Sequence, residues 1–96
     1  MPAADLEEDI ARLVRRLRGF SPRTWVAVGR RDAIRRLTAD LVALGEPGHV
    51  LPDLPDSALG DIVAVLAREA VSYQESANGR RDEVATAVRR ALDETR

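Results

Sequence analysis

The stretch LGDIVAVLAREAVSY, residues 59–73, decides the fold that the sequence predicts. Its apolar residues recur three and four positions apart, which is the spacing of one helical face. The members of that face are Leu59, Ile62, Val63, Leu66, Ala70 and Tyr73. Val65 and Val71 project outside this face and leave only a narrow polar stripe, which comprises Asp61, Arg68, Ser72 and Glu75. Because such a helix must be covered on several sides, we expect it to be central in a bundle, or to self-associate through Val65 and Val71.

The rest of the chain shows the periodicity and the end signals of amphipathic helices. We expect main helices over 4–18, 32–44 and 82–95, and a short helix over 22–28. Their inward residues are Leu6, Ile10, Leu13, Val14, Leu17, Ile34, Leu37, Leu41, Leu44, Val84, Val88, Ala91 and Leu92. Ser21 is placed to cap the short helix, and Pro22 occupies its first position, where a missing N–H costs nothing. Gly19, Gly29 and Gly45 are placed to end helices.

These patterns predict an all-α fold. No sustained alternation of apolar and polar residues indicates a strand. A length of 96 residues suits one domain, and fractions of 45% hydrophobic and 32% charged residues are typical of a folded chain. We therefore expect one domain over 1–96, a compact bundle of four main helices plus one short helix.

One connection, residues 45–56, is long and rich in proline and glycine. It carries Val50, Leu51 and Leu54, which are large aliphatic residues for a loop. Its prolines restrict the unfolded chain and so lower the cost of ordering. We expect this loop to fold back as a lid on the core, and an exposed docking loop is the alternative. Either Asp53 or Asp56 is expected to cap the following helix.

The segment LPDLPDSALGDIVAVLAREA, residues 51–70, resembles one found in small uncharacterised all-helical proteins of GC-rich actinobacteria. The residues that match are Leu51, Pro52, Leu54, Gly60, Asp61, Ala64 and Val65. Arg68 stands where those proteins carry His. The resemblance implies a cytoplasmic location and supplies no mechanism, since those proteins have no assigned activity.

Charge is divided unevenly along the chain. The net charge is −1, yet residues 11–36 hold nine Arg and one acid, which gives +8, whereas the remainder holds six Arg and fifteen acids, which gives −9. Either the two parts attract each other within one domain, or the arginines bind something else. The arginines expected to contact an acidic partner are Arg15, Arg16, Arg31, Arg35 and Arg36.

Nucleic acid is the alternative ligand for the arginine-rich segment 11–36. A short helix, a turn glycine at Gly29 and a second helix are reminiscent of a helix-turn-helix motif. In that alignment Ile34 and Leu37 are out of phase by one position, which is a poor match. A net charge near zero also disfavours a dedicated nucleic-acid-binding protein.

Several chemistries have no support in the sequence. There is no Cys, and His49 is the single His, so zinc ligation is poorly supported. No Ser lies in a Gly-x-Ser-x-Gly turn, and one His could serve only one of them, so nucleophilic catalysis is poorly supported as well. No catalytic, cofactor or metal site is therefore expected. No apolar run is long enough to span a bilayer, and the acidic beginning of the chain lacks a signal pattern. We expect a cytoplasmic, non-enzymatic module that binds a protein partner or a second copy of itself.

Overall fold

Helices make up nearly all of the described chain, and no strand occurs in it. The computed structural model describes residues 3–26, 29–45, 48, 54–76 and 79–96. The segments are α1 (Ala3–Arg18), α2 (Pro22–Trp25), α3 (Arg30–Leu44), the 3₁₀ turn η1 (Asp56–Ala58), α4 (Leu59–Ser76) and α5 (Arg81–Glu94). The predicted all-α bundle of four main helices and one short helix is thus confirmed. None of the described helices is long and apolar enough to cross a membrane.

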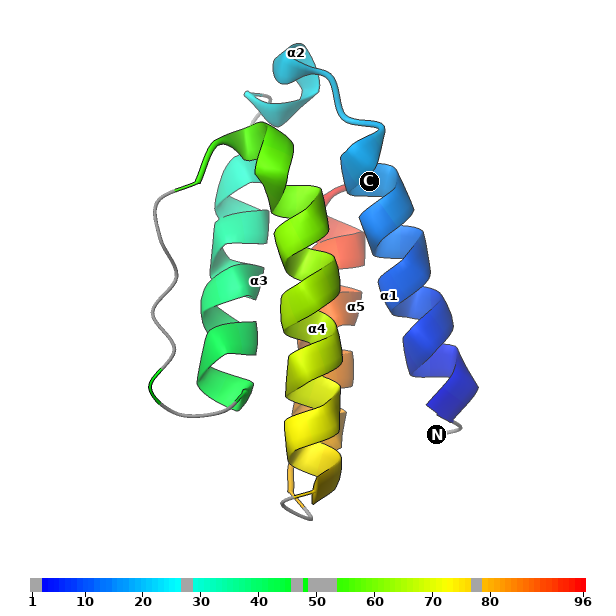
Figure 1. Ribbon diagram of the computed structural model, residues 1–96. Helices are drawn as coiled ribbons and strands as arrows, with labels where there is room; N and C mark the ends of the chain where they lie inside the picture. Colours follow the sequence, from blue (N-terminus) through cyan, green and yellow to red (C-terminus); the bar gives the residue numbers. More distant parts are fainter. Residues whose placement is uncertain (1–2, 27–28, 46–47, 49–53, 77–78) are drawn as a thin grey trace.

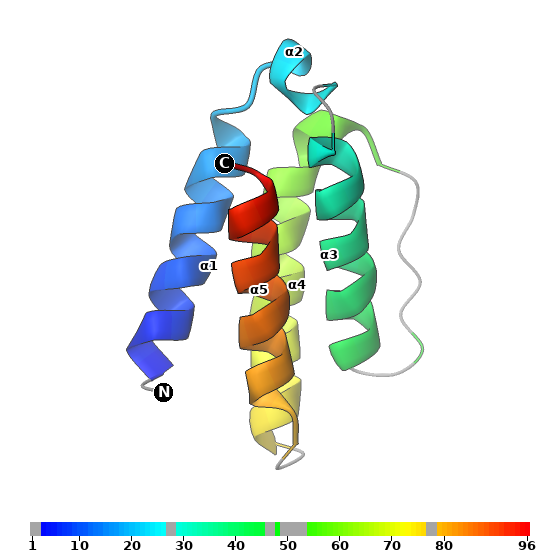
Figure 2. The ribbon, with the colours of Figure 1, turned by 180° about the vertical axis from the view of Figure 1, so that it is seen from behind.

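The four long helices lie roughly side by side, with α2 across one end of the bundle (Figure 1). In this view α4 is in front, between α1 and α3, and α5 lies behind it; the opposite view shows α5 in front (Figure 2). α1 and α4 are antiparallel, whereas α3 and α4 run in the same direction (Figure 1). The connection from α3 to η1 therefore starts and finishes at opposite ends of the bundle, which explains why it must be long.

α4 has the central position that its apolar sequence predicts. It contacts α1, α3 and α5, as well as η1. α5 likewise contacts the other three long helices, so the centre is shared between α4 and α5. The buried face of α4 is rotated about the helix axis relative to the predicted face. The buried residues are Leu59, Gly60, Val63, Ala67, Ala70 and Gln74. Ile62, Leu66 and Tyr73 are only partly buried, because no long helix covers that side fully.

The core is formed almost entirely by aliphatic side chains. Nearly all the predicted inward residues of α1, α3 and α5 are buried, and Ile10 is partly buried against them. Val63 of α4, Val84 of α5 and Ile34 of α3 are each completely inaccessible to solvent. Burial of this kind contributes about 1.5–3 kcal/mol for each large aliphatic side chain. The amphipathic periodicity of the sequence therefore predicted the core correctly.

α2 closes the end of the bundle with an aromatic pair. The Ser21 hydroxyl accepts a hydrogen bond from the Thr24 N–H at 3.2 Å and so caps α2, as predicted. Trp25 is buried and meets Phe20 edge to face, with ring centroids 5.0 Å apart. Gly29 does not end this helix: α2 already ends at Trp25, and Gly29 precedes α3 with a φ of +83°, a conformation that favours glycine.

The described part of the loop does not test the predicted lid, and Asp53 lies outside the described residues. Leu54 is partly buried, whereas Val50, Leu51 and His49 lie outside the described residues. Asp56 does not cap a helix with its side chain. Its carboxylate instead accepts hydrogen bonds from Arg31, so it ties η1 to α3.

A buried glutamine joins three elements at the opposite end of the bundle. Gln74 is 4% exposed, and its Nε2 donates to the Leu44 carbonyl at 2.6 Å. Its Oε1 accepts from the Arg80 N–H, also at 2.6 Å. One side chain of α4 thereby satisfies backbone groups at the end of α3 and at the start of α5, which would otherwise lack a partner in their own helices.

Candidate protein-interaction groove

Asp56 holds two of the arginines that were expected to contact a partner. The Arg31 Nε and Nη2 donate to the Asp56 carboxylate at 3.0 and 2.6 Å, and Arg35 Nη2 lies 3.6 Å from it. The two-pronged hydrogen bond is the strongest geometry for a guanidinium and a carboxylate. These hydrogen bonds, together with the negative charge of Asp56, raise the pKa of Arg31 above its ordinary value. Both guanidinium groups are therefore engaged within the chain.

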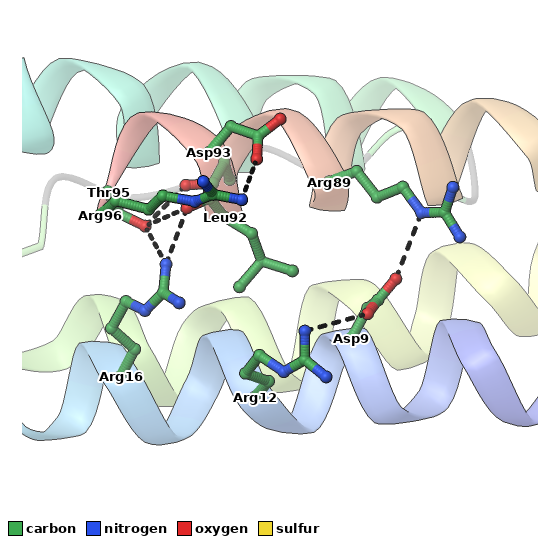
Figure 3. Close-up of polar contacts among 9 residues, drawn as sticks. Asp9, Arg12, Arg16, Arg89, Leu92, Asp93, Thr95 and Arg96 are labelled. Carbon is green, nitrogen blue, oxygen red and sulfur yellow. Dashed lines mark hydrogen bonds and ion pairs between the residues drawn. The ribbon is translucent and has the colours of Figure 1, made fainter.

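Arg36 and Arg16 are also engaged within the chain, at α5. Arg36 Nη1 lies 3.3 Å from the Glu94 carboxylate. Arg16 Nη1 donates to the Leu92 carbonyl at 2.7 Å and to the Thr95 hydroxyl at 3.2 Å (Figure 3). A guanidinium in this place complements the negative end of the α5 dipole. Asp9 also joins α1 to α5, because its carboxylate pairs with Arg89 at 3.3 Å (Figure 3).

The attraction between the basic and acidic parts of the chain is thus realised inside the domain. Four of the five arginines expected at an interface contact acids, carbonyls or hydroxyls of the same chain: Arg16, Arg31, Arg35 and Arg36. Arg15 differs from them. It is exposed, and it makes no hydrogen bond or ion pair with any residue that the structure describes.

Arg15 lies beside a groove between the antiparallel helices α1 and α4. The groove has a volume of about 740 Å³. Its apolar lining consists of Ile10, Ala11, Val14, Ala64 and Val71. Its polar and charged lining consists of Glu7, Arg15, Arg18, Arg68, Ser72 and Glu75. Because Ile10, Ala64 and Val71 are only partly buried, the groove offers an apolar floor between charged walls.

The charges of the groove are separated along its length. α1 and α4 are antiparallel, so Glu7 near the start of α1 and Glu75 near the end of α4 lie at the same end of the groove. Arg15 and Arg18 lie toward the other end, and Arg68 lies between the two ends. Arg18 pairs with Asp61 at 2.8 Å, and Glu75 pairs with Arg81 at 3.3 Å.

Three charged groups of the groove have no ionic or hydrogen-bonding partner among the described residues: Glu7, Arg15 and Arg68. They are exposed and stand on both walls, since Arg68 belongs to α4 and the other two to α1. Charges of this kind are available to a ligand without the loss of an existing ion pair.

The two valines predicted for self-association have different surroundings. Val71 is partly buried and lines the groove opposite α1. Val65 is 49% exposed and does not line it. The structure thus brings Arg15 and Val71 to one surface. Periodicity alone does not predict the groove, because a groove depends on which face of α1 packs beside α4.

No metal-binding cluster occurs in the described chain, since no three residues of the types His, Cys, Asp and Glu come together there. The single His lies outside the described residues. The groove itself combines guanidinium and carboxylate groups with aliphatic side chains. This combination suits recognition of a helical surface.

Comparisons with family models, with curated proteins and with solved structures find no match to this chain. The resemblance of residues 51–70 to actinobacterial proteins therefore stays a prediction.

Proposed function

We propose that this protein is a non-enzymatic protein-interaction module and that the groove between α1 and α4 is its binding surface. The single observation that carries the proposal is the arrangement of Arg15 and Arg68. These arginines stand on opposite walls, above an apolar floor, with no partner among the described residues. A helix with an apolar stripe and flanking carboxylates would complement this surface, as in other helix-in-groove complexes.

The apolar and the charged residues of the groove would have different roles in binding. Contact with Ile10, Ala64 and Val71 would supply affinity, because it removes apolar surface from water. The guanidinium groups of Arg15 and Arg68 would guide the approach of an acidic partner and select its orientation. A cytoplasmic location is part of the proposal, since a chain without Cys suits a reducing compartment.

Nucleic-acid binding by segment 11–36 is the competing proposal. Against it, seven of the nine arginines in this segment already contact described acids, carbonyls or hydroxyls of the same chain. Binding of duplex DNA would also be opposed by the carboxylates beside them. We expect no detectable affinity for duplex DNA even at low salt. Binding that weakens steeply as salt rises would favour the nucleic-acid proposal instead.

Site-specific photo-crosslinking in the cells that make the protein tests the proposed surface. A photoreactive amino acid at Ser72, which is exposed in the groove, should give discrete adducts with polypeptides. The same amino acid at Ala39, which is exposed on α3 and away from the groove, is the matched control. Replacing both Arg15 and Arg68 by Glu should remove the Ser72 adducts. Equal adducts from both positions, or none from Ser72, would contradict the proposal.

A further inference from the structure

We infer that the occupant of the groove is a second copy of this chain, packed antiparallel about a two-fold axis that passes close to Ala11. This inference rests on the proposed function, because it names the partner of the same surface. It is carried by the complementarity of the groove to itself. One end holds Glu7 and the other end holds Arg15, and neither has a partner among the described residues, whereas Glu75 and Arg18 at the same ends are paired with Arg81 and Asp61.

A two-fold axis that lies in the plane of the interface, perpendicular to the long axis of the groove, would exchange the two ends of the groove. The basic end of one copy would then face the acidic end of the other, and the same contact would occur twice. Such an isologous interface uses one patch on both subunits. If the α1 helices of the two copies ran parallel instead, Arg15 of one copy would face Arg15 of the other, and Glu7 would face Glu7. Repulsion between like charges disfavours this arrangement.

The spacing along α1 fixes where the axis would pass. Glu7 and Arg15 are eight residues apart, or about 12 Å along the helix. Their midpoint is Ala11, an exposed residue that lines the groove. A small side chain at the crossing point allows two helices to approach closely. Three charged residues of α1 line the groove: Glu7, Arg15 and Arg18. Of these three, Glu7 and Arg15 have no ionic or hydrogen-bonding partner among the described residues.

The remaining groove charge can join the same contacts. Arg68 lies between the two ends on α4 and has no described partner. The proposed axis would bring it near the Arg68 of the second copy, so its long side chain must turn away from that residue and toward the acidic end of the second copy. The net charge of the chain, −1, opposes the approach of two copies only weakly. A partner helix with carboxylates along its whole length would match the groove less well, because Glu7 would repel one of its ends.

Sedimentation velocity on charge-reversed full-length chains tests this geometry. The wild-type protein should self-associate as its concentration rises into the tens of micromolar. Arg15→Glu and Glu7→Arg should each weaken self-association by about tenfold or more, because each creates two like-charge contacts per dimer. An equimolar mixture of the two variants should form mixed dimers, since every contact then joins opposite charges again. Arg23→Glu and Glu69→Arg, exposed positions outside the groove, are the charge-matched controls and should associate normally.

The outcomes separate this inference from the proposed function. A wild-type chain that stays monomeric at every concentration would overturn the second copy as occupant. Adducts from Ser72 to other polypeptides would in that case still support the interaction module. Self-association that neither reversal weakens, or that the mixture fails to restore, would show a dimer on another face and would overturn the inference as well. Circular dichroism of each variant establishes that it is folded.

Discussion

Gln74→Leu should be the most damaging polar-to-apolar substitution in this protein. Leucine has a similar volume, so the packing around position 74 should change little. The Leu44 carbonyl and the Arg80 N–H would each lose a partner that now lies at 2.6 Å. The hydrogen bond to the Leu44 carbonyl is buried, so water has little access to replace it, whereas the hydrogen bond from the Arg80 N–H is only partly buried.

The expected loss of stability follows from these two contacts. A buried backbone group left without a partner costs about 1–3 kcal/mol. The Leu44 carbonyl should cost this full amount and the partly buried Arg80 N–H about 1 kcal/mol, which together give a decrease of about 2–4 kcal/mol in the free energy of unfolding, from a total that is typically 5–15 kcal/mol. For a domain of this size, the midpoint of thermal unfolding should fall by roughly 10–25 °C.

Urea denaturation followed by far-UV circular dichroism measures this decrease. Ser76→Ala, at an exposed position near the end of the same helix, is the control and should leave stability nearly unchanged. A Gln74→Leu chain within 0.5 kcal/mol of the wild type would refute the reasoning, since this value lies below the cost of a single unsatisfied group.

Gln74→Glu adds a pH signature to the same prediction. Burial disfavours the carboxylate, so the pKa of Glu at position 74 should lie above its unfolded value. The neutral acid can still donate to the Leu44 carbonyl, whereas the carboxylate cannot. Relative to the wild type, this variant should therefore be least destabilised below a pH of about 4.3, the ordinary Glu pKa, and the deficit should grow as pH rises through the folded pKa.

Three further substitutions test other parts of the account. Val63→Ala should lower the free energy of unfolding by about 2 kcal/mol in urea titrations, because it removes a fully buried side chain from α4; Val65→Ala in the same helix should be neutral. Gly29→Ala should cost about 1–2 kcal/mol in the same assay, because of its left-handed backbone conformation, whereas Gly19→Ala should cost far less. Asp56→Asn should speed amide hydrogen exchange at residues 58–60, because it weakens the contacts between η1 and α3; unchanged exchange would contradict that role.

The fold could be predicted because its core depends on periodicity. Each long helix repeats its apolar residues at three and four positions, and nearly all of these residues are buried. The central place of α4 followed from apolar residues around most of its circumference. What the pattern missed is Gln74, because a polar residue near a helix end is more often solvated than buried. The pattern also misplaced the buried face of α4, since Ile62, Leu66 and Tyr73 differ little in apolar character from the residues that are buried.

The groove could be predicted only in pieces. Arg15 was selected from a cluster of like charges and Val71 from its place outside the main face of α4, and the two meet in the structure. The other four arginines were indistinguishable from Arg15 in sequence. Their partners, such as Asp56 and Glu94, are distant along the chain and become neighbours only because the fold brings η1 and α5 beside α3.

A dilution series of amide NMR spectra tests most directly the claim that the α1/α4 groove is the surface at which two copies of this protein bind each other. With rising concentration, resonances of groove-facing residues within 7–18 and 64–75 should shift together along one binding curve. Resonances from the exposed faces of α3 and α5 should stay in place. Shifts confined to α3 and α5, or spread evenly over the chain, would contradict the claim.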